Sequence, residues 1–177
     1  MQKQYDEAIV CGRFQPFHND HLRYILASLG KCRFLWIGIA KPFRRIDAQS
    51  QSHREQMESN PFTYLQRLRM IRTSLAECGV PSDTYCIIPF DFEDSQLLRE
   101  SDPGCDVVLM TRTDGWSHEK QRKIESLGKE VEVLYEELNP AITGSLIRTK
   151  MREGDESWNL MVPPAVTRVI HCSNSNG

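Results

Sequence analysis

The chain has 177 residues with a formal net charge of -2, and 40% of its residues are hydrophobic. This length suits one compact domain and is too short for two large ones. The charge balance argues against binding to nucleic-acid backbones, which usually needs a basic stripe, but it leaves small anionic ligands open. No apolar run approaches the roughly 20 residues that cross a bilayer, and the first six residues lack an apolar signal-peptide core. We therefore expect a cytoplasmic protein that binds neither nucleic acid nor membranes.

The first apolar run, Ala8–Cys11, is ended by Gly12 and predicts a strand. Four aliphatic side chains then follow at helical spacing and predict a helix that ends at Gly30. They are Leu22, Ile25, Leu26 and Leu29. A second strand is predicted over Phe34–Ile39. The polar stretch over residues 41–60 is long for a loop in a compact domain, so we expect it to be functional.

Thr63 and Gln66 have the spacing of a capping box, which predicts the start of a helix that ends near Gly79. Its inward face is predicted from four apolar residues, Leu65, Leu68, Ile71 and Leu75. A third strand is predicted over Tyr85–Ile88. The acidic stretch over residues 90–105 predicts a partly helical excursion.

Two strands and three helices complete the predicted elements. The strands are Val107–Met110 and Val131–Tyr135, and the helices are His118–Leu127, Ser145–Arg152 and Pro164–Ile170. Continuous apolar runs are typical of strands buried on both faces, as in a parallel sheet. The alternation therefore predicts an α/β fold, a Rossmann-like doubly wound parallel sheet of about five strands with helices on both faces. We expect a single domain over residues 1–172 and a disordered tail over residues 173–177.

The six cysteines form no C-x-x-C pair and no spacing typical of a zinc site. Most lie within or beside apolar runs, and only Cys172 has a histidine next to it. We expect reduced, packed thiols. The remaining cysteines are Cys11, Cys32, Cys78, Cys86 and Cys105.

The segment after the first strand carries the residues best suited to chemistry, because ligands of open parallel sheets bind at the carboxyl ends of strands. Gly12 lets the backbone approach a ligand. His18 and His21 share one face at the start of the first helix, where free N–H groups and the helix dipole favour an anion. The pair could instead cap the helix or bind a metal, although no third ligand follows at short spacing.

A second candidate anion site lies at residues 142–148. Thr143 and Ser145 place two hydroxyls at the start of a predicted helix, and Arg148 follows one turn later. Hydroxyls and backbone N–H groups can hold phosphate oxygens while a guanidinium supplies charge and a planar fork. Taken alone, the segment is better explained by an ordinary helix cap with an exposed arginine.

Together, the two segments resemble a known family. The run from Gly12 to His18, with His21, resembles the (H/T)-x-G-H signature of the nucleotidylyltransferase superfamily. Its GRFQPFH form is similar to archaeal-type nicotinamide mononucleotide (NMN) adenylyltransferases and related small cytidylyltransferases. Residues 143–148 resemble the second signature of the superfamily, and residues 60–63 with Arg67 resemble a further stretch.

The resemblance implies a transferase that moves a nucleoside monophosphate from ATP or CTP to the phosphate or phosphonate of a small acceptor, with Mg²⁺ and release of pyrophosphate. The best match is NMN adenylyltransferase. A CTP-dependent enzyme acting on a phosphonate and a non-catalytic nucleotide sensor are alternatives. The implied catalytic residues are His18, His21 and Arg148. The implied phosphate and nucleotide contacts are Gly12, Arg13, Phe14, Thr143 and Ser145, to which we add Lys41 at the end of the second strand.

The sequence departs from the family pattern at three places. Asp20 stands where the family has glycine, so it either faces the ligands or points away as a first-turn acid. The basic stretch at 41–53 and the segment after the fourth strand also differ, and we expect acceptor contacts there. The candidates are Arg44, Arg45, His53, Arg112, Asp114 and Trp116. Relatives of this kind are often homo-oligomers, and the sequence leaves this open.

Overall fold

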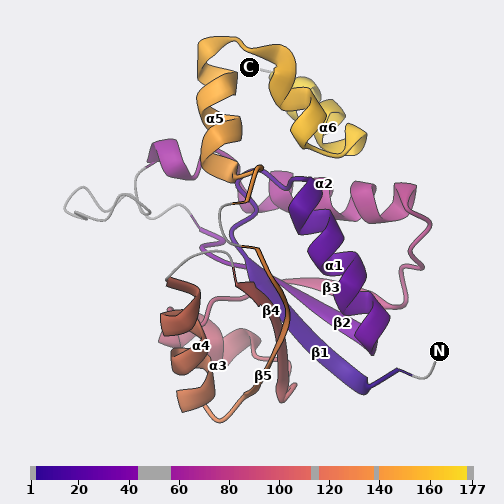
Figure 1. Ribbon diagram of the computed structural model, residues 1–177, viewed down its shortest axis with the longest axis vertical. Coiled ribbons are helices and arrows are strands. Elements are labelled where there is room, and N and C mark those ends of the chain that lie inside the picture. The colour runs from indigo at the N-terminus through magenta and orange to yellow at the C-terminus, as the bar shows by residue number, and fades with distance from the viewer. Residues whose placement is uncertain (1–2, 44–56, 113–115, 138–139, 175–177) are drawn as a thin grey trace.

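The computed structural model describes residues 3–43, 57–112, 116–137 and 140–174. Its centre is a five-stranded sheet in the order β3-β2-β1-β4-β5, and all four pairings are parallel (Figure 1). The strands are β1 (Tyr5–Gly12), β2 (Cys32–Ile39), β3 (Tyr85–Pro89), β4 (Val107–Arg112) and β5 (Glu130–Glu136). All five predicted strands are confirmed, each slightly longer than its apolar run.

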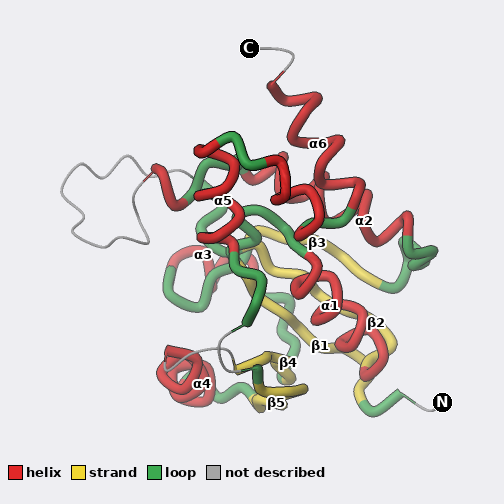
Figure 2. The backbone as a smooth tube through the Cα atoms, turned by 45° about the horizontal axis from the view of Figure 1, so that its top comes forward, coloured by secondary structure: helices red, strands yellow, loops and turns green. Residues whose placement is uncertain are grey.

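Six α-helices and two short 3₁₀ helices connect and follow the strands in the described part of the chain (Figure 2). The helices are α1 (Asn19–Lys31), α2 (Tyr64–Glu77), α3 (Ser95–Ser101), α4 (Trp116–Ser126), α5 (Gly144–Glu153) and α6 (Pro164–Asn174). The 3₁₀ helices are η1 (Met57–Ser59) and η2 (Glu156–Met161). The predicted capping box is confirmed, because the Gln66 N–H donates to the Thr63 hydroxyl and the Thr63 N–H donates to the Gln66 side chain.

Helices cover both faces of the sheet, as the doubly wound prediction requires. Side chains alternate along β1: Ala8 and Val10 pack on the face covered by α1, α2, α5 and α6. Ile9 and Cys11 pack on the opposite face, together with Ile124 of α4. The strand order therefore reverses between β1 and β4, where the connecting helices change from one face of the sheet to the other. This change opens a crevice at the carboxyl ends of β1 and β4.

Two helices differ from their predicted inward faces. Leu26 of α1 is 38% exposed and Leu65 of α2 is 53% exposed, whereas Arg67 is only 1% exposed. The buried stripe of α2 is rotated so that Arg67, Met70 and Ile71 face inward. A charged side chain thus occupies a position where hydrophobic periodicity predicts an apolar one, because backbone carbonyl oxygens there accept its hydrogen bonds.

The end of the chain forms a helical layer, α5, η2 and α6, that packs against α2 (Figure 1). Helix α6 runs through Asn174, so the first two residues of the expected tail are helical. The remaining tail, and residues 44–56 of the expected functional stretch, lie outside the described residues. All six cysteines are free, and Cys11, Cys32 and Cys105 are buried as expected, whereas Cys78 and Cys172 are exposed rather than packed. Within the described ranges, no helix has the length and apolar character needed to cross a membrane.

Candidate active site

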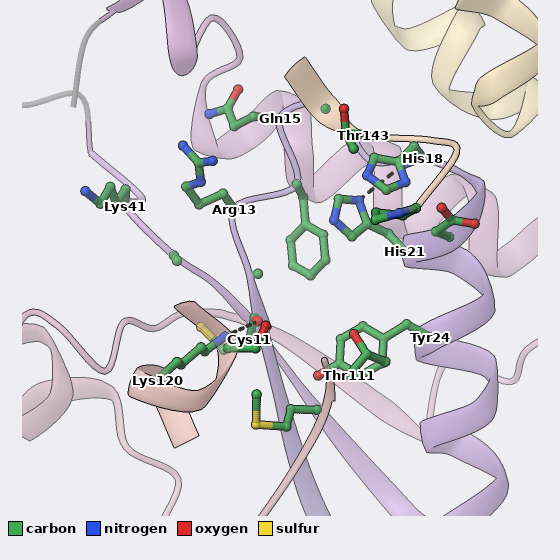
Figure 3. A pocket seen from close by; sticks show the side chains of 18 of the residues that line it. Cys11, Arg13, Gln15, His18, His21, Tyr24, Lys41, Thr111, Lys120 and Thr143 are labelled. Atoms are coloured by element: carbon green, nitrogen blue, oxygen red, sulfur yellow. Dashed lines mark hydrogen bonds between the residues drawn. The ribbon is translucent and has the colours of Figure 1, made fainter. Parts of the chain in front are cut away.

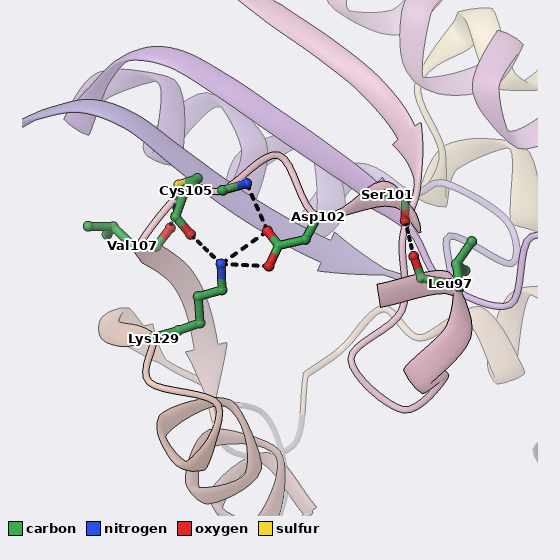
Figure 4. Close-up of polar contacts among 7 residues, drawn as sticks. Leu97, Ser101, Asp102, Cys105, Val107 and Lys129 are labelled. Atoms are coloured by element: carbon green, nitrogen blue, oxygen red, sulfur yellow. Dashed lines mark hydrogen bonds and ion pairs between the residues drawn. The ribbon is translucent and has the colours of Figure 1, made fainter. Parts of the chain in front are cut away.

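A cavity of about 660 Å³ lies at the carboxyl ends of the strands (Figure 3). Its walls come from the segments that follow β1, β2 and β3, from the start of α1, from α4, and from the connection between β5 and α5. Both segments that the sequence singled out, residues 12–21 and 142–148, contribute to it. The topology thus brings two motifs more than 120 residues apart to one site.

The loop after β1 has a constrained backbone. Phe14 has a φ of 52°, in the left-handed region that residues other than glycine rarely adopt, and its side chain is buried, at 1% exposure. The Gln15 amide group makes two 2.9 Å hydrogen bonds, donating to the Phe62 carbonyl and accepting from the Phe62 N–H. Gly12 packs against the Phe14 ring, where an added Cβ would lie 2.8 Å from a ring carbon. This packing fixes the path of the loop between β1 and α1.

His18 and His21 stack at the start of α1, with ring centroids 3.6 Å apart and planes at 26°. The His18 backbone N–H donates to His21 Nδ1 over 3.3 Å, so a neutral His21 carries its proton on Nε2. The Phe14 ring packs edge-on against His21 at 4.9 Å between centroids. Both imidazoles line the cavity, which places their ring edges beside the free N–H groups of the helix start.

Burial keeps both histidines neutral in the ligand-free protein. It lowers the pKa of His18 to about 4. The pKa of His21 is also well below its ordinary value, first because of burial and then because of the neighbouring His18 and the Arg13 charge. A polyanion in the cavity would favour the protonated forms, so the site can gain positive charge on binding.

The second motif begins α5 and reaches the first motif directly. The Thr143 hydroxyl caps the helix by accepting a 3.1 Å bond from the Leu146 N–H. Arg148, one turn later, donates to the Gln15 carbonyl at 2.6 Å. An added Cβ at Gly144 would lie 2.7 Å from that carbonyl oxygen, so the two segments meet only because residue 144 has no side chain.

Arg67 ties together the ends of β1 and β2. Its guanidinium donates to the carbonyl oxygens of Arg13, Ala40 and Lys41, each at 2.8 Å. The Lys41 N–H donates in turn to the Asp91 carboxylate over 3.1 Å, which links the end of β3. Both predicted cations, Arg13 and Lys41, line the cavity from this clamped region. Sequence reasoning related Arg67 to the family but gave it no place in the site.

Helix α4 supplies a wall that the sequence did not predict. Lys120 lines the cavity and donates to the Cys11 carbonyl oxygen at 3.1 Å. Lys123, one turn further, and Ser117 also line the cavity. A polar helix face of this kind normally indicates solvent exposure, so no local signal distinguished these lysines.

Asp20 lines the cavity and also acts within the first turn of α1. Its carboxylate lies 3.5 Å from the Arg23 guanidinium, which also pairs with Glu137 and lies 5.2 Å above the Tyr135 ring. Partial burial raises the pKa of Asp20, while the Arg23 charge opposes this shift. Asp20 therefore lies both in the first turn of α1 and at the edge of the cavity, beside the Arg23 cation.

The other predicted residues are placed as follows. Ser145 does not line the cavity, although it lies in the first turn of α5. Arg112 does not line it either, because its guanidinium is held by Glu136 and by Gln121 at 2.7 Å. Arg44, Arg45, His53, Asp114 and the side chain of Trp116 lie outside the described residues.

A family model described as cytidylyltransferase-like matches residues 9–150. The chain belongs to the cytidylyltransferase-like family. A phosphonoformate cytidylyltransferase from Streptomyces viridochromogenes is 33% identical over 164 residues, covering 92% of this chain and 89% of the relative. A nicotinamide-nucleotide adenylyltransferase from Picrophilus torridus is 33% identical over 167 residues, covering 92% of this chain and 89% of the relative.

A solved structure of similar fold is the bifunctional NMN adenylyltransferase/ADP ribose pyrophosphatase of Francisella tularensis, in complex with AMP and a manganese ion. It superposes with a TM-score of 0.61 at 22% identity, over 85% of this chain. This cytidylyltransferase-like chain spans only 42% of that longer protein, so the match supports the fold. The family, the fold and the enzyme class that the sequence predicted, a nucleotidylyltransferase, are confirmed.

Proposed function

We propose that the cavity binds a nucleoside triphosphate and a small acceptor, and transfers the nucleoside monophosphate to a phosphate or phosphonate oxygen of the acceptor. The observation that carries the proposal is the meeting of two helix starts around one cavity. Stacked His18 and His21 begin one helix, and Thr143, followed by Arg148, begins the other. Free N–H groups, imidazoles and a guanidinium facing one space are matched to a polyphosphate.

In the proposed reaction, an anionic oxygen of the acceptor attacks the α-phosphorus of the triphosphate. The bond from this phosphorus to the oxygen that bridges the α- and β-phosphates breaks, and its electron pair leaves with pyrophosphate. The attacking oxygen is already ionised near pH 7, so no general base is required. The residues act by positioning the reactants and stabilising charge on the transferred phosphoryl group and the leaving group. We assign these roles to His18, His21, Arg13 and Arg148.

Magnesium fits this site as an ion carried by the triphosphate. Among the described residues, no group of three or more histidine, cysteine or acidic side chains could hold a metal ion. Magnesium in such sites is usually held by substrate phosphates, water and one or two carboxylates, and Asp91 and Glu93 line the cavity. When bound, it would supply neutralisation of phosphate charge.

Two pairs of substrates are supported by the relatives. The first is ATP with NMN, after the adenylyltransferase relatives. The second is CTP with a small phosphonate, after the phosphonoformate cytidylyltransferase.

The test is pyrophosphate release with each donor, ATP or CTP, combined with NMN or phosphonoformate, in the presence of Mg²⁺ or of a chelator. His18→Ala and His21→Ala should each lower turnover on the active pair by about 10² or more. His118→Ala is the matched control, since His118 is exposed on α4 and does not line the cavity. Tight nucleotide binding without pyrophosphate release from any pair would contradict the proposal and favour a nucleotide sensor.

A further inference from the structure

Lys120 brings a positive charge into the cavity and forms no ion pair with a described carboxylate. Its single hydrogen bond among the described residues goes to the Cys11 carbonyl oxygen at 3.1 Å, and no described acidic group lies within ion-pair distance. An ammonium group has three N–H donors, so two remain for a ligand. The Lys120 side chain is half-buried at the cavity wall.

This charge lies away from the phosphate-binding motifs. Figure 3 shows Lys120 beside Cys11, on the opposite side of the cavity from His18 and His21, whereas Arg13 lies at the upper left with Lys41. A triphosphate held at the two helix starts therefore leaves the Lys120 end to another group. Nucleobases and riboses are uncharged near pH 7, so they do not match an ammonium as an anionic group does.

Three acidic residues also line the cavity near α4 and the loop after β3, namely Asp91, Glu93 and Glu119. Both oxygens of the Asp91 carboxylate accept backbone hydrogen bonds, one from the Lys41 N–H at 3.1 Å and the other from the Glu93 N–H at 2.9 Å. Asp91 therefore shapes the loop after β3. Lys123, on the same face of α4 as Lys120, adds a second cation at the cavity wall.

We propose that Lys120 binds a second anionic group of the acceptor, distal to the oxygen that attacks the α-phosphorus. This inference rests on the proposed function and narrows its acceptor class. The acceptor is a small phosphonate or phosphate that also carries a carboxylate or comparable anion. An acceptor without that group loses one charge-assisted hydrogen bond at this end of the cavity.

The experiment compares two acceptors that share the attacking phosphonate and differ in the second anion, phosphonoformate and methylphosphonate. The wild-type protein should show a kcat/KM about 10- to 100-fold higher for phosphonoformate, the range expected for one charge-assisted hydrogen bond. Lys120→Met should reduce this ratio to about one, with the larger loss of kcat/KM on phosphonoformate. Lys120→Arg should keep most of the preference because it keeps the charge.

Arg122→Met is the matched control, since it removes a cation from an exposed position of the same helix that does not line the cavity. An unchanged ratio in Lys120→Met would overturn the inference. An equal loss with both acceptors, with a raised KM for the triphosphate, would also overturn it, because Lys120 would then bind the donor.

Thermal unfolding of the same variants separates this inference from the proposed function. Phosphonoformate should raise the Tm of the wild-type protein more than methylphosphonate does, and Lys120→Met should abolish the difference. That result would support the Lys120 site even if no pyrophosphate were released and the proposed reaction failed. Equal Tm shifts from both compounds in the wild-type protein would contradict the Lys120 site whatever the reaction.

Discussion

The two histidines at the start of α1 are packed so that their neutral forms are favoured. His18 is 6% exposed and stacks on His21, and burial lowers the pKa values of both. A second positive charge in such a pair is unfavourable until an anion arrives. Packing therefore keeps the pair neutral, and as a result the free energy of unfolding falls when the protein is acidified.

Acidification from pH 7 to pH 5 should destabilise the ligand-free protein through these histidines. Above about pH 6.5 both the folded and the unfolded forms are neutral, and stability is complete. Below about pH 6.5 the two histidines bind protons in the unfolded chain but stay neutral in the folded chain, until the pH approaches the folded pKa of about 4 for His18. Each histidine contributes up to about 1.4 kcal/mol of lost unfolding free energy per pH unit.

Urea unfolding at several pH values measures this slope. The double substitution of His18 and His21 by Asn should flatten it between pH 5 and pH 7. A slope that persists in the double variant would show that other groups cause the acid sensitivity.

Gly144 lets the start of α5 approach the Gln15 carbonyl closely because it has no side chain. Gly144→Ala should destabilise the protein by about 1–3 kcal/mol, since the new methyl group would meet the Gln15 carbonyl oxygen at 2.7 Å. It should also lower kcat/KM, because Arg148 donates to the same oxygen. Gly30→Ala should instead stabilise by about 0.5–1 kcal/mol, since Gly30 lies within α1 with no atom within 4 Å of the added group. Thermal unfolding and steady-state kinetics of both variants check the contrast.

At the scale of elements, Arg67 of α2 holds two strand ends in place. Its three 2.8 Å bonds to backbone carbonyls fix the segments that carry Arg13 and Lys41 toward the cavity. It is a positioning residue, because it contacts the backbone of these segments and does not line the cavity. The packing of α2 therefore determines where Arg13 and Lys41 lie in the site.

Removal of the Arg67 guanidinium should impair catalysis beyond its effect on stability. Arg67→Met leaves the three carbonyl oxygens without that donor, so we expect a loss of stability of about 3 kcal/mol and at least a tenfold lower kcat/KM. Leu75→Ala, a fully buried site on the same helix, should lose about 2–5 kcal/mol and keep its kcat/KM below its Tm. Equal kinetic losses in the two variants, assayed while both are folded, would show that Arg67 acts only on stability.

The elements of this fold could be predicted because their signals are local. Apolar runs such as Val107–Met110 and the capping box at Thr63 depend on neighbours in the sequence. The rotation of α2 that buries Arg67 could not be predicted, because its partners are carbonyl oxygens of distant strand ends. Lys120 was missed for the same reason, since only the strand order places α4 beside Cys11.

At the scale of the whole molecule, the core extends beyond the residues that the family model matches. The match ends at residue 150, but the main core also contains Trp158, Val166 and Ile170, which are at most 5% exposed. Helix α6 packs on α2, and α2 carries Arg67. Helix α6 therefore supports the site from behind without lining the cavity.

Shortening one core side chain in this layer should lower stability and leave substrate binding intact. Ile170→Ala removes methyl groups from a position that is 3% exposed, so the free energy of unfolding should fall by about 2–5 kcal/mol. Below its Tm the variant should keep the wild-type KM for donor and acceptor, since no residue of α6 lines the cavity. Leu160→Ala is the control, because that side chain is 83% exposed and should change stability by less than about 0.5 kcal/mol. A raised KM in the folded Ile170→Ala variant would show that α6 shapes the site as well as the core.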